Sequence, residues 1–289
     1  MPPYKILVTG ATGFIGTEVI RLLAPKYTIR IFSRRHIQIP GIEVIVGDLT
    51  KQKDIEKAVS GIDCIVHLAA TIIGDEKITY EFNVTSTKLL VEAAKKQKIK
   101  QFIFLSSENV LWPHQSSYGR SKMKGEQIVN ELRQHLILRC SVVYGPGNKI
   151  NLGRIIIFVK KMKFILIPGT GKHLMQPIHV KDVAHFIKNG IDKRIEGNYV
   201  IAGASRISLN EFVDLVARFL GKKIIKFHIP LWLIYPYVKV RELFPHASIK
   251  WSQIRNLNTT RVYNIKEAVR DFGYAPRSIK DGLVFLKPC

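Results

Sequence analysis

The sequence predicts an α/β protein built on a doubly wound parallel sheet, with a smaller substrate-binding lobe toward the carboxyl end. From residue 4 to about 145, apolar strand-like runs alternate with amphipathic helical stretches, which is the pattern of such a sheet. A glycine-rich turn stands between the first strand and the first helix. The 289 residues, 46% of them hydrophobic, suffice for a large core. In this fold class, ligands bind at the carboxyl ends of the strands.

The glycine-rich turn predicts a dinucleotide site. It joins the apolar run 4–8 to a helix expected near 14–24. Gly10 permits the tight turn, Gly13 lets a pyrophosphate approach bare backbone, and Gly16 lets the helix pack close to the strand. The helix N-terminus adds unpaired N–H groups and the positive end of a dipole. The expected cofactor contacts in this turn are Gly10, Thr12, Gly13, Phe14, Ile15 and Gly16.

The other elements of the first half follow the same rhythm. Strands are expected at Ile6–Thr9, Thr28–Phe32, Glu43–Val46, Cys64–His67, Gln101–Ser106 and Ile137–Arg139. Helices are expected near 14–24, 52–60, 80–98 and 118–135. Beyond these, 150–175 and 205–250 are interpreted as helical or irregular, with short strands at Gln176–Val180 and Asn198–Ile201. We therefore predict a dinucleotide-binding domain over 1–147, with parts of 176–202 interleaved, and a substrate-binding lobe over 148–289.

The end of the second strand predicts which cofactor binds. In dinucleotide folds this position meets the adenosine ribose, and an acidic residue there favours NAD. Here the acid is missing and Ser33, Arg34 and Arg35 stand in its place. Guanidinium groups suit a phosphate dianion, so we predict NADP, with NAD as the alternative. If the arginines are only solvated loop residues, this preference has no basis.

The third and fourth strand ends complete the expected cofactor site. Asp48 and Leu49 follow the third strand, where Asp48 would accept from the adenine amino group, cap the next helix, or do both. His67 is expected to be a packed histidine at the end of the fourth strand, not a catalyst. The small or apolar residues after it leave room for the cofactor; they are Leu68, Ala69 and Ala70.

A tyrosine and a lysine four residues apart predict acid–base chemistry. Tyr118 and Lys122 share one face at the start of a helix. An ammonium near a phenol lowers its pKa, which would make Tyr118 a usable acid or base. Upstream, a buried strand ends in Ser106 and Ser107, and a serine there can orient a substrate hydroxyl or carbonyl toward Tyr118.

These motifs together resemble the extended short-chain dehydrogenases/reductases, with their Rossmann-type sheet. The resemblance extends to the carboxyl end, and its further marks are Asn83-Val84, Tyr144–Gly147, Pro177–Ala184 and Gly273–Pro276. It implies that Tyr118 is the general acid/base, that Lys122 also bonds the nicotinamide ribose, and that Ser107 positions the reacting oxygen. It also implies cofactor contacts at Asn83 and Ser106. A hydride would then pass between the nicotinamide and a carbinol carbon.

The sequence departs from the sugar-nucleotide members of this family at two positions. They usually carry an asparagine where this chain has Val142, and an arginine shortly before the histidine–valine pair, where this chain has Met175-Gln176-Pro177. Both groups contact the nucleotide diphosphate in that family. Three basic residues are candidates to replace them, although each is more typical of an ordinary surface charge: Arg154, Lys172 and Arg255.

The departures bring two other branches of the family closer. One contains steroid dehydrogenase-like enzymes, and the other contains an NADP-binding accessory subunit of respiratory complex I that is mainly structural. The apolar, aromatic stretch 227–238, flanked by lysines, fits either branch. It would line an apolar substrate pocket, touch a membrane surface, or pack as core of the lobe. We expect the core, and expect the same of 155–159 and 164–167.

The charge of the chain favours anionic partners. Forty-five Lys and Arg against 22 Asp and Glu give a net charge of +23, which suits a phosphorylated substrate, NADP or an anionic membrane. We recognise no nucleic-acid-binding module. The three cysteines predict neither disulfides nor a metal site. We expect a cytoplasmic protein, peripheral to the membrane at most, and a homodimer formed through the helices near 80–98 and 118–135, as the resemblance implies.

Three functions are consistent with these observations. The first is an NAD(P)-dependent oxidoreductase or epimerase acting at a secondary alcohol or ketone of a nucleotide sugar, and the full set of Tyr118, Lys122 and Ser107 favours it. The second is an NADP-dependent dehydrogenase or reductase of an apolar, steroid- or lipid-like alcohol. The third is a non-catalytic NADP-binding subunit.

Overall fold

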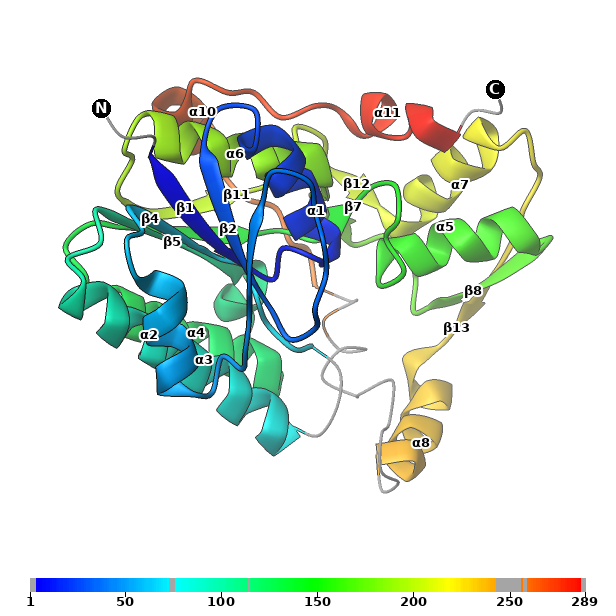
Figure 1. Cartoon of the computed structure of the whole chain (residues 1–289). Helices are drawn as coiled ribbons and strands as arrows, with labels where there is room; N and C mark the ends of the chain where they lie inside the picture. The colour runs from blue at the N-terminus through cyan, green and yellow to red at the C-terminus, as the bar shows by residue number, and fades with distance from the viewer. Residues whose placement is uncertain (1–3, 73–75, 114, 243–255, 257–258, 287–289) are drawn as a thin grey trace.

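The computed structural model describes residues 4–72, 76–113, 115–242, 256 and 259–286. A seven-stranded parallel sheet forms the larger part, in the order β11-β6-β5-β4-β1-β2-β3, and confirms the predicted doubly wound α/β fold. A lobe lies beside the carboxyl ends of the strands, and helix α8 projects from that lobe (Figure 1). The strands of the sheet are β1 Lys5–Thr9, β2 Thr28–Ser33, β3 Glu43–Val46, β4 Cys64–His67, β5 Gln101–Ser107, β6 His135–Cys140 and β11 Gly197–Ile201.

Helices cover both faces of this sheet (Figure 1). One face carries α1 Phe14–Leu23, α6 Val180–Asp192 and α10 Lys266–Phe272, and the other carries α2 Gln52–Val59, α3 Glu76–Lys96 and α4 Ser117–Val129. Successive residues of β1 point to opposite faces, so Ile6 and Val8 join one core and Leu7 the other. This double burial explains why the central strands β1, β4 and β5 contain continuous apolar runs.

The lobe has its own core and three small sheets. Helices α5 Leu152–Lys161 and α7 Leu209–Phe219 pack together there, and α8 Leu231–Glu242, α11 Ile279–Gly282 and the 3₁₀ turns η1 Glu108–Leu111 and η2 Val284–Leu286 complete the helices described. The strands pair as β7 Val143–Tyr144 with β10 Ile178–His179, β9 Leu174–Met175 with β12 Ile207–Ser208, and β8 Phe164–Pro168 with β13 Ile225–Ile229.

The lobe contains the clearest departures from the expected elements. The stretches that include 164–168 and 225–229 were expected to be helical or irregular, but they pair as parallel strands. The expected core role of 227–238 is wrong: Phe227, Trp232 and Tyr237 are exposed, although Val238 is buried. The segments 155–159 and 164–167 were expected to be core as well, but each is buried on one face only. Ile156 and Val159 are buried in the helix, and Ile165 and Ile167 are buried in the strand. One face of each element packs on the lobe, and the other remains apolar and open.

Candidate active site

The glycine-rich turn has the shape that its spacing predicts. Gly10 has φ +72°, and a Cβ on it would lie 2.7 Å from the backbone nitrogen of Ala69. A Cβ on Gly16 would lie 2.2 Å from the carbonyl oxygen of Gly10. Gly13 is the N-cap residue of α1, so no side chain caps the helix there, and both Gly13 and Thr12 are exposed. Backbone N–H groups at an open helix N-terminus are suited to a pyrophosphate, so the turn fits a dinucleotide.

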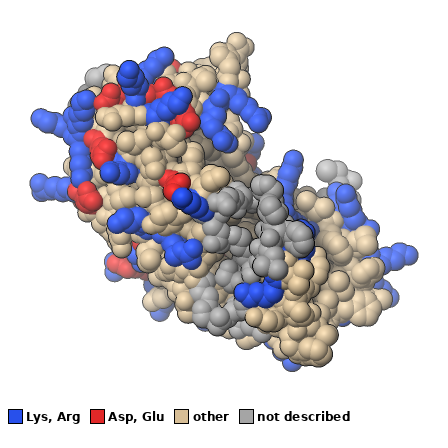
Figure 2. Space-filling model, turned by 90° about the horizontal axis from the view of Figure 1, so that it is seen from below, with Lys and Arg blue, Asp and Glu red and all other residues tan. Residues whose placement is uncertain are grey.

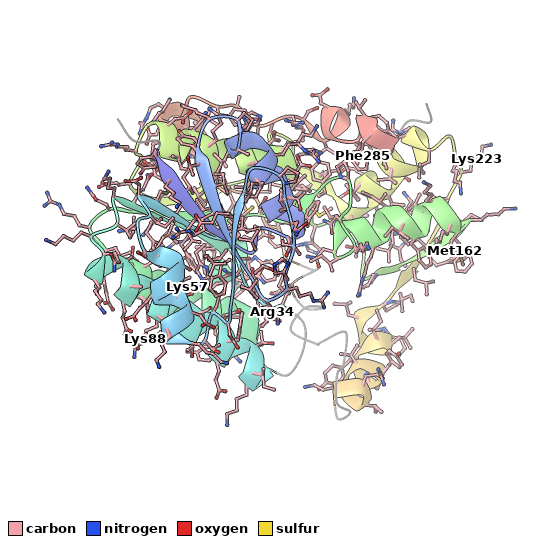
Figure 3. The ribbon with its side chains drawn as sticks, viewed as in Figure 1. Arg34, Lys57, Lys88, Met162, Lys223 and Phe285 are labelled. Atoms are coloured by element: carbon pink, nitrogen blue, oxygen red, sulfur yellow. The ribbon has the colours of Figure 1, made fainter. Side chains whose placement is uncertain are left out.

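The second strand ends in a serine and two exposed arginines. Ser33 is buried, and its hydroxyl accepts a hydrogen bond from the backbone N–H of Arg35 at 3.1 Å. Arg34 and Arg35 are exposed, and Figure 3 shows Arg34 on the side of the sheet domain toward the lobe. Both guanidinium groups therefore have room to meet an anion at this strand end.

Asp48 follows β3 but does not cap the next helix. Its carboxylate accepts from the backbone N–H of Thr50 at 2.9 Å and from the Thr50 hydroxyl at 2.8 Å, while Lys51 is the N-cap residue of α2. These hydrogen bonds, and more weakly the charge of Arg34, lower the pKa of Asp48. The expected capping role is thus wrong, and the carboxylate stays near Arg34. Leu49 is buried beside it.

The fourth strand ends in a packed histidine, as predicted. His67 is buried between the hydroxyls of Thr9 at 2.7 Å and Thr87 at 3.1 Å, and its ring stacks on Phe104. Burial, reinforced by the charge of Lys122, holds the pKa of His67 well below its usual range, so the ring is neutral. The next residues, Leu68, Ala69 and Ala70, are partly exposed and line this strand end.

Asn83 joins three segments next to this strand end. Its amide oxygen accepts from the backbone N–H of Thr71 at 2.8 Å, and its NH₂ donates to the Thr71 carbonyl and to the Ser121 hydroxyl, each at 3.0 Å. Ser121 in turn donates to the carbonyl of Tyr118. Asn83 is buried, so these bonds fix the start of α4 against the loop after β4.

Ser107, Tyr118 and Lys122 meet at the carboxyl end of β5. The Ser107 hydroxyl, which accepts a hydrogen bond from the backbone N–H of Asn109 at 3.2 Å, lies near enough to the Tyr118 phenol to lower its pKa, so a residue of the strand and a residue of α4 come together here. The first turn of α4 is held by Ser116, whose hydroxyl accepts from the backbone N–H of Gly119. Thr9, His67 and this serine end adjacent strands, so the pair lies on the same edge of the sheet as the glycine turn.

The expected effect of Lys122 on Tyr118 is not found in this structure. Burial raises the pKa of Tyr118, and the nearby Ser107 hydroxyl opposes this only in part. Lys122 Nζ lies 6.0 Å from the Tyr118 ring centroid and donates to the carbonyl of Leu105 at 2.8 Å. Burial lowers the pKa of Lys122 itself to about 7. Desolvation of both groups thus outweighs their mutual attraction.

Ser106 is turned away from the cofactor side by a buried ion pair that the motifs did not indicate. Its hydroxyl donates to Glu126 at 2.6 Å, and Glu126 is bound by Arg139 at 2.8 Å. Glu126 and Ser106 are buried. Any contact from Ser106 to a cofactor would therefore come from its backbone. The signal in the sequence that could have indicated this ion pair was Arg139, a charged residue inside the apolar strand β6.

A second buried charge pair lies directly beyond Ser107, and the motifs did not indicate it either. Glu108 is buried, and Arg261 lies 3.7 Å from its carboxylate while stacking over the ring of Trp112. Burial raises the pKa of Glu108, and Arg261 opposes the shift. The nearby Tyr263 hydroxyl also lowers the pKa of Glu108. The pair connects the end of β5 to the carboxyl-terminal part of the chain, beside the candidate reacting hydroxyls.

The two departures from the sugar-nucleotide pattern are seen in the structure. Met175 and Gln176 are buried, and Gln176 donates to the carbonyl of Gly203 at 2.8 Å and accepts from the N–H of Tyr263 at 2.9 Å. Gln176 is therefore committed to holding the lobe together. Arg154 and Lys172 are exposed, and Arg255 lies outside the described residues.

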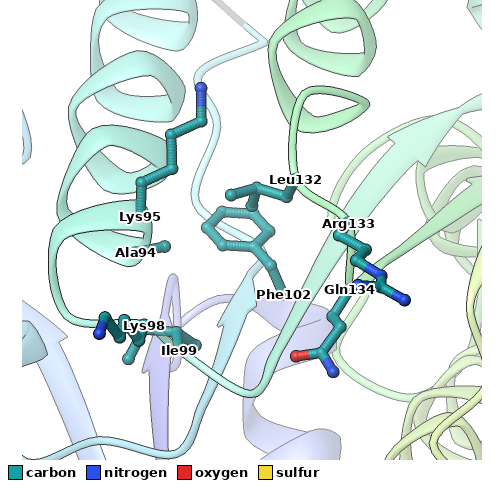
Figure 4. A pocket seen from close by; sticks show the side chains of 8 residues that line it. All are labelled: Ala94, Lys95, Lys98, Ile99, Phe102, Leu132, Arg133 and Gln134. Atoms are coloured by element: carbon teal, nitrogen blue, oxygen red, sulfur yellow. The ribbon is translucent and has the colours of Figure 1, made fainter.

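A pocket of about 510 Å³ lies elsewhere on the sheet domain (Figure 4). Phe102 and Ile99 line it at the amino end of β5, whereas Ser107 ends the same strand. It is therefore separate from the candidate active site. Among the described residues, no group of three or more metal-ligating side chains gathers, and no helix has the length and hydropathy needed to cross a bilayer.

Comparisons with known proteins agree with this architecture. N-acetyl-alpha-D-glucosaminyl-diphospho-ditrans,octacis-undecaprenol 4-epimerase of Escherichia coli O157:H7 is 27% identical over 252 residues, covering 78% of this chain and 75% of the relative. A 3-beta-hydroxysteroid dehydrogenase of Mycolicibacterium neoaurum is 23% identical, covering 94% of this chain and 87% of the relative. The structure of MoeE5 in complex with UDP-glucose and NAD has a TM-score of 0.78 at 22% identity, covering 96% of each chain, and thus shares the fold.

The family assignment comes from the sheet half and the residues that follow it. Residues 6–202 match the NAD dependent epimerase/dehydratase family, which is well over half of the chain. Relatives such as UDP-glucose 4-epimerase of Vibrio cholerae and the steroid dehydrogenase are enzymes. The chain therefore belongs to the NAD dependent epimerase/dehydratase family, a family of enzymes within the extended short-chain dehydrogenases/reductases.

Proposed function

We propose that this protein is an NADP-dependent oxidoreductase that acts at a secondary alcohol or the corresponding ketone. The placement of the Ser107 hydroxyl near the Tyr118 phenol, at the same sheet edge as the glycine turn, carries the proposal. Only Tyr118 and Ser107 have to touch the reacting oxygen in this scheme.

Each residue of the site then has a distinct task. Ser107 holds the substrate oxygen, and Tyr118 donates a proton to it during reduction or removes one during oxidation. Lys122 binds the nicotinamide ribose, for which its ammonium must leave the Leu105 carbonyl or be shared with it. The cofactor, when bound, supplies or accepts the hydride. The neutral His67 only supports the packing of this strand end.

NADP is proposed over NAD because of the second strand end. Ser33, Arg34 and Arg35 offer a hydroxyl and two guanidinium groups where an acidic residue would repel the 2′-phosphate. The exposure of both arginines supports this assignment.

A lipid-like or lipid-linked alcohol is the substrate class that we propose first. Neither of the two expected diphosphate contacts has its usual residue: Val142 stands in place of the asparagine, and the buried Met175 and Gln176, with Pro177, stand where the arginine is expected. Two relatives have names that include undecaprenol and steroid groups. A nucleotide sugar is the second candidate, because UDP-glucose 4-epimerase is also a relative, at 25% identity. In either case Glu108 and Arg261 lie beside Ser107, where a polar group of the substrate would meet them.

The test is turnover by the purified protein with a panel of a steroid alcohol and ketone, a polyprenyl-diphosphate amino sugar and UDP-glucose. Tyr118→Phe should lower kcat by about 10²- to 10⁴-fold, because it removes the proton donor, and should leave the Kd for NADP unchanged. Tyr199→Phe is the matched control, since Tyr199 bonds Asp271 at the far edge strand β11. Full turnover by Tyr118→Phe would contradict the assigned mechanism, and turnover of UDP-glucose alone would favour the second substrate class.

A further inference from the structure

The two-stranded sheet of the lobe has an apolar face open to solvent. In β8 and β13, Phe164 lies opposite Ile225 and Leu166 lies opposite Phe227, so all four side chains point to one face. The alternate residues of β8, Ile165 and Ile167, are buried in the lobe. The outer four are exposed, Ile225 to 61%, and the rings of Phe164 and Phe227 contact edge to face at 6.1 Å.

Helix α8 continues this apolar surface along the chain. It starts directly after β13 and Pro230, and it presents Trp232 and Tyr237, which are 72% and 64% exposed. Leu233, Tyr235 and Val240 are exposed as well. We call the side chains of Phe164, Leu166, Ile225, Phe227, Trp232 and Tyr237 the lobe apolar surface. Exposed apolar side chains gathered in this number are typical of an interaction site.

The charge around the lobe apolar surface is predominantly positive. The sequence has no Asp or Glu between Glu131 and Asp182, and none between Asp214 and Glu242. The basic residues in these segments that lie close to β8, β13 and α8 along the chain are Lys160, Lys161, Lys163, Lys222, Lys223, Lys226, Lys239 and Arg241. Asp214, at the edge of one segment, pairs with Lys226 at 2.6 Å. On the face that Figure 2 shows, acidic side chains lie over the sheet domain, whereas the charged side chains on the lobe are basic.

We propose that the lobe apolar surface docks on an anionic lipid bilayer. Trp and Tyr rings favour the level of the headgroups, and lysines flanking them reach lipid phosphates. A second copy of this chain fits less well, because it would bring two sets of lysines face to face. Docking is peripheral, since no helix among the described residues can span a bilayer. This inference does not depend on the substrate, although a lipid-like substrate would be reached from the same surface.

The geometry also indicates which residues enter the membrane. Trp232 lines a pocket of about 570 Å³ together with Lys172 and His228, which lies on the face of β13 opposite to Phe227, so a lysine stands near this ring. Lys163 and Lys223 precede β8 and β13 at the same end of the two-stranded sheet, where the N–H of Ile225 donates to the carbonyl of Lys163. Figure 3 shows Lys223 and Met162 at this outer end of the lobe, far from Lys57 and Lys88 of the sheet domain.

The experiment is flotation of the whole protein with vesicles, without substrate. Vesicles of phosphatidylcholine are compared with vesicles containing about one third phosphatidylglycerol, at low and high salt. We expect binding to the anionic vesicles that weakens with salt. Phe227→Ser with Trp232→Ser, and separately Lys163→Glu with Lys223→Glu, should each weaken this binding at least about tenfold. The milder Trp232→Phe should stay folded and lose most of the blue shift in tryptophan fluorescence that vesicles cause.

Matched controls separate docking from the general positive charge. Ile78→Ser changes an exposed apolar residue of α3, and Lys53→Glu with Lys57→Glu changes two exposed lysines of α2. These should bind vesicles within about twofold of the unaltered protein. The proposal is overturned by three results: no binding to anionic vesicles, equal losses in lobe and control variants, or a dimer in sedimentation that the Phe227 and Trp232 changes dissociate. Because no assay uses turnover, failure here would leave the proposed reaction intact.

Discussion

The ammonium of Lys122 is buried beside the Phe104 ring, 4.5 Å from its centroid. Among the described residues it has one hydrogen bond, to the carbonyl of Leu105. Burial lowers the pKa of Lys122 to about 7, so in the absence of cofactor the site is poised between a charged and a neutral lysine near neutral pH. A bound ribose would supply further hydrogen-bond acceptors for this ammonium. Lys122 thus couples cofactor binding to proton balance.

This gives a pH-dependent stability. Between pH 7 and 10.5 the unfolded chain keeps the proton on Lys122 while the folded chain has lost it, so the free energy of unfolding rises with pH across this window. Lys122→Met removes that dependence while keeping the side-chain length. In urea unfolding, the free energy of unfolding of the unaltered protein should rise relative to that of Lys122→Met as the pH increases from 7 to 10.5. The expected slope is at most about 1.4 kcal/mol per pH unit. A constant difference from pH 6 to 10 would show that the lysine titrates normally.

Two glycines of the turn between β1 and α1 have different tasks, because their surroundings differ. Gly16 is needed for packing, whereas Gly13 is needed for cofactor binding. A Cβ on Gly16 would meet the Gly10 carbonyl oxygen at 2.2 Å, whereas a Cβ on Gly13 would meet the same atom at 3.2 Å and otherwise face open space. Gly13 has φ −79°, which alanine tolerates. Gly16→Ala should therefore lower the melting temperature strongly, since β1 and α1 must separate.

Gly13→Ala should keep most of the stability and weaken NADP binding at least about tenfold, because its methyl group would occupy the approach of the pyrophosphate. Circular dichroism melting and a fluorescence titration with NADPH distinguish the two variants. If Gly13→Ala bound NADPH normally, the pyrophosphate would have to lie elsewhere.

The elements that the sequence predicts best are those whose pattern depends on neighbours in the chain. The strands β1, β2, β4 and β5 are almost entirely buried, so each contains a short apolar run, and strand ends such as Ser33 and Ser107 could be located from these runs. Strands β8 and β13 could not be recognised, because each is half-exposed and its partner lies about sixty residues away. The pairs Glu126–Arg139 and Glu108–Arg261 also depend on contacts between separate segments. The prediction that Lys122 lowers the pKa of Tyr118 was wrong for another reason. The spacing of the two residues predicts that they are close, but burial determines their pKa values.

At the level of the whole molecule, the charge and the apolar surface are divided between the two parts. The sheet domain displays acidic as well as basic side chains, while the lobe has long segments without Asp or Glu, 132–181 and 215–241, and combines lysines with exposed aromatic rings. An enzyme arranged in this way would meet an anionic cofactor at the sheet edge and an anionic surface at the lobe. The homodimer through α3 and α4 stays a prediction; those helices pack against each other and the sheet, with Ile78 and Met123 exposed.

The measurement that tests the proposed function most directly is a thermal-shift titration with NADP and with NAD. The melting temperature should rise with the concentration of NADP, because a ligand at 100 times its Kd adds about 2.7 kcal/mol to the free energy of unfolding. NAD should have the same effect only at a much higher concentration. The double change Arg34→Ala and Arg35→Ala should remove that preference and leave NAD binding nearly unchanged. An equal or larger shift with NAD would contradict the assignment of the arginines, and no shift with either cofactor would contradict the proposed oxidoreductase itself.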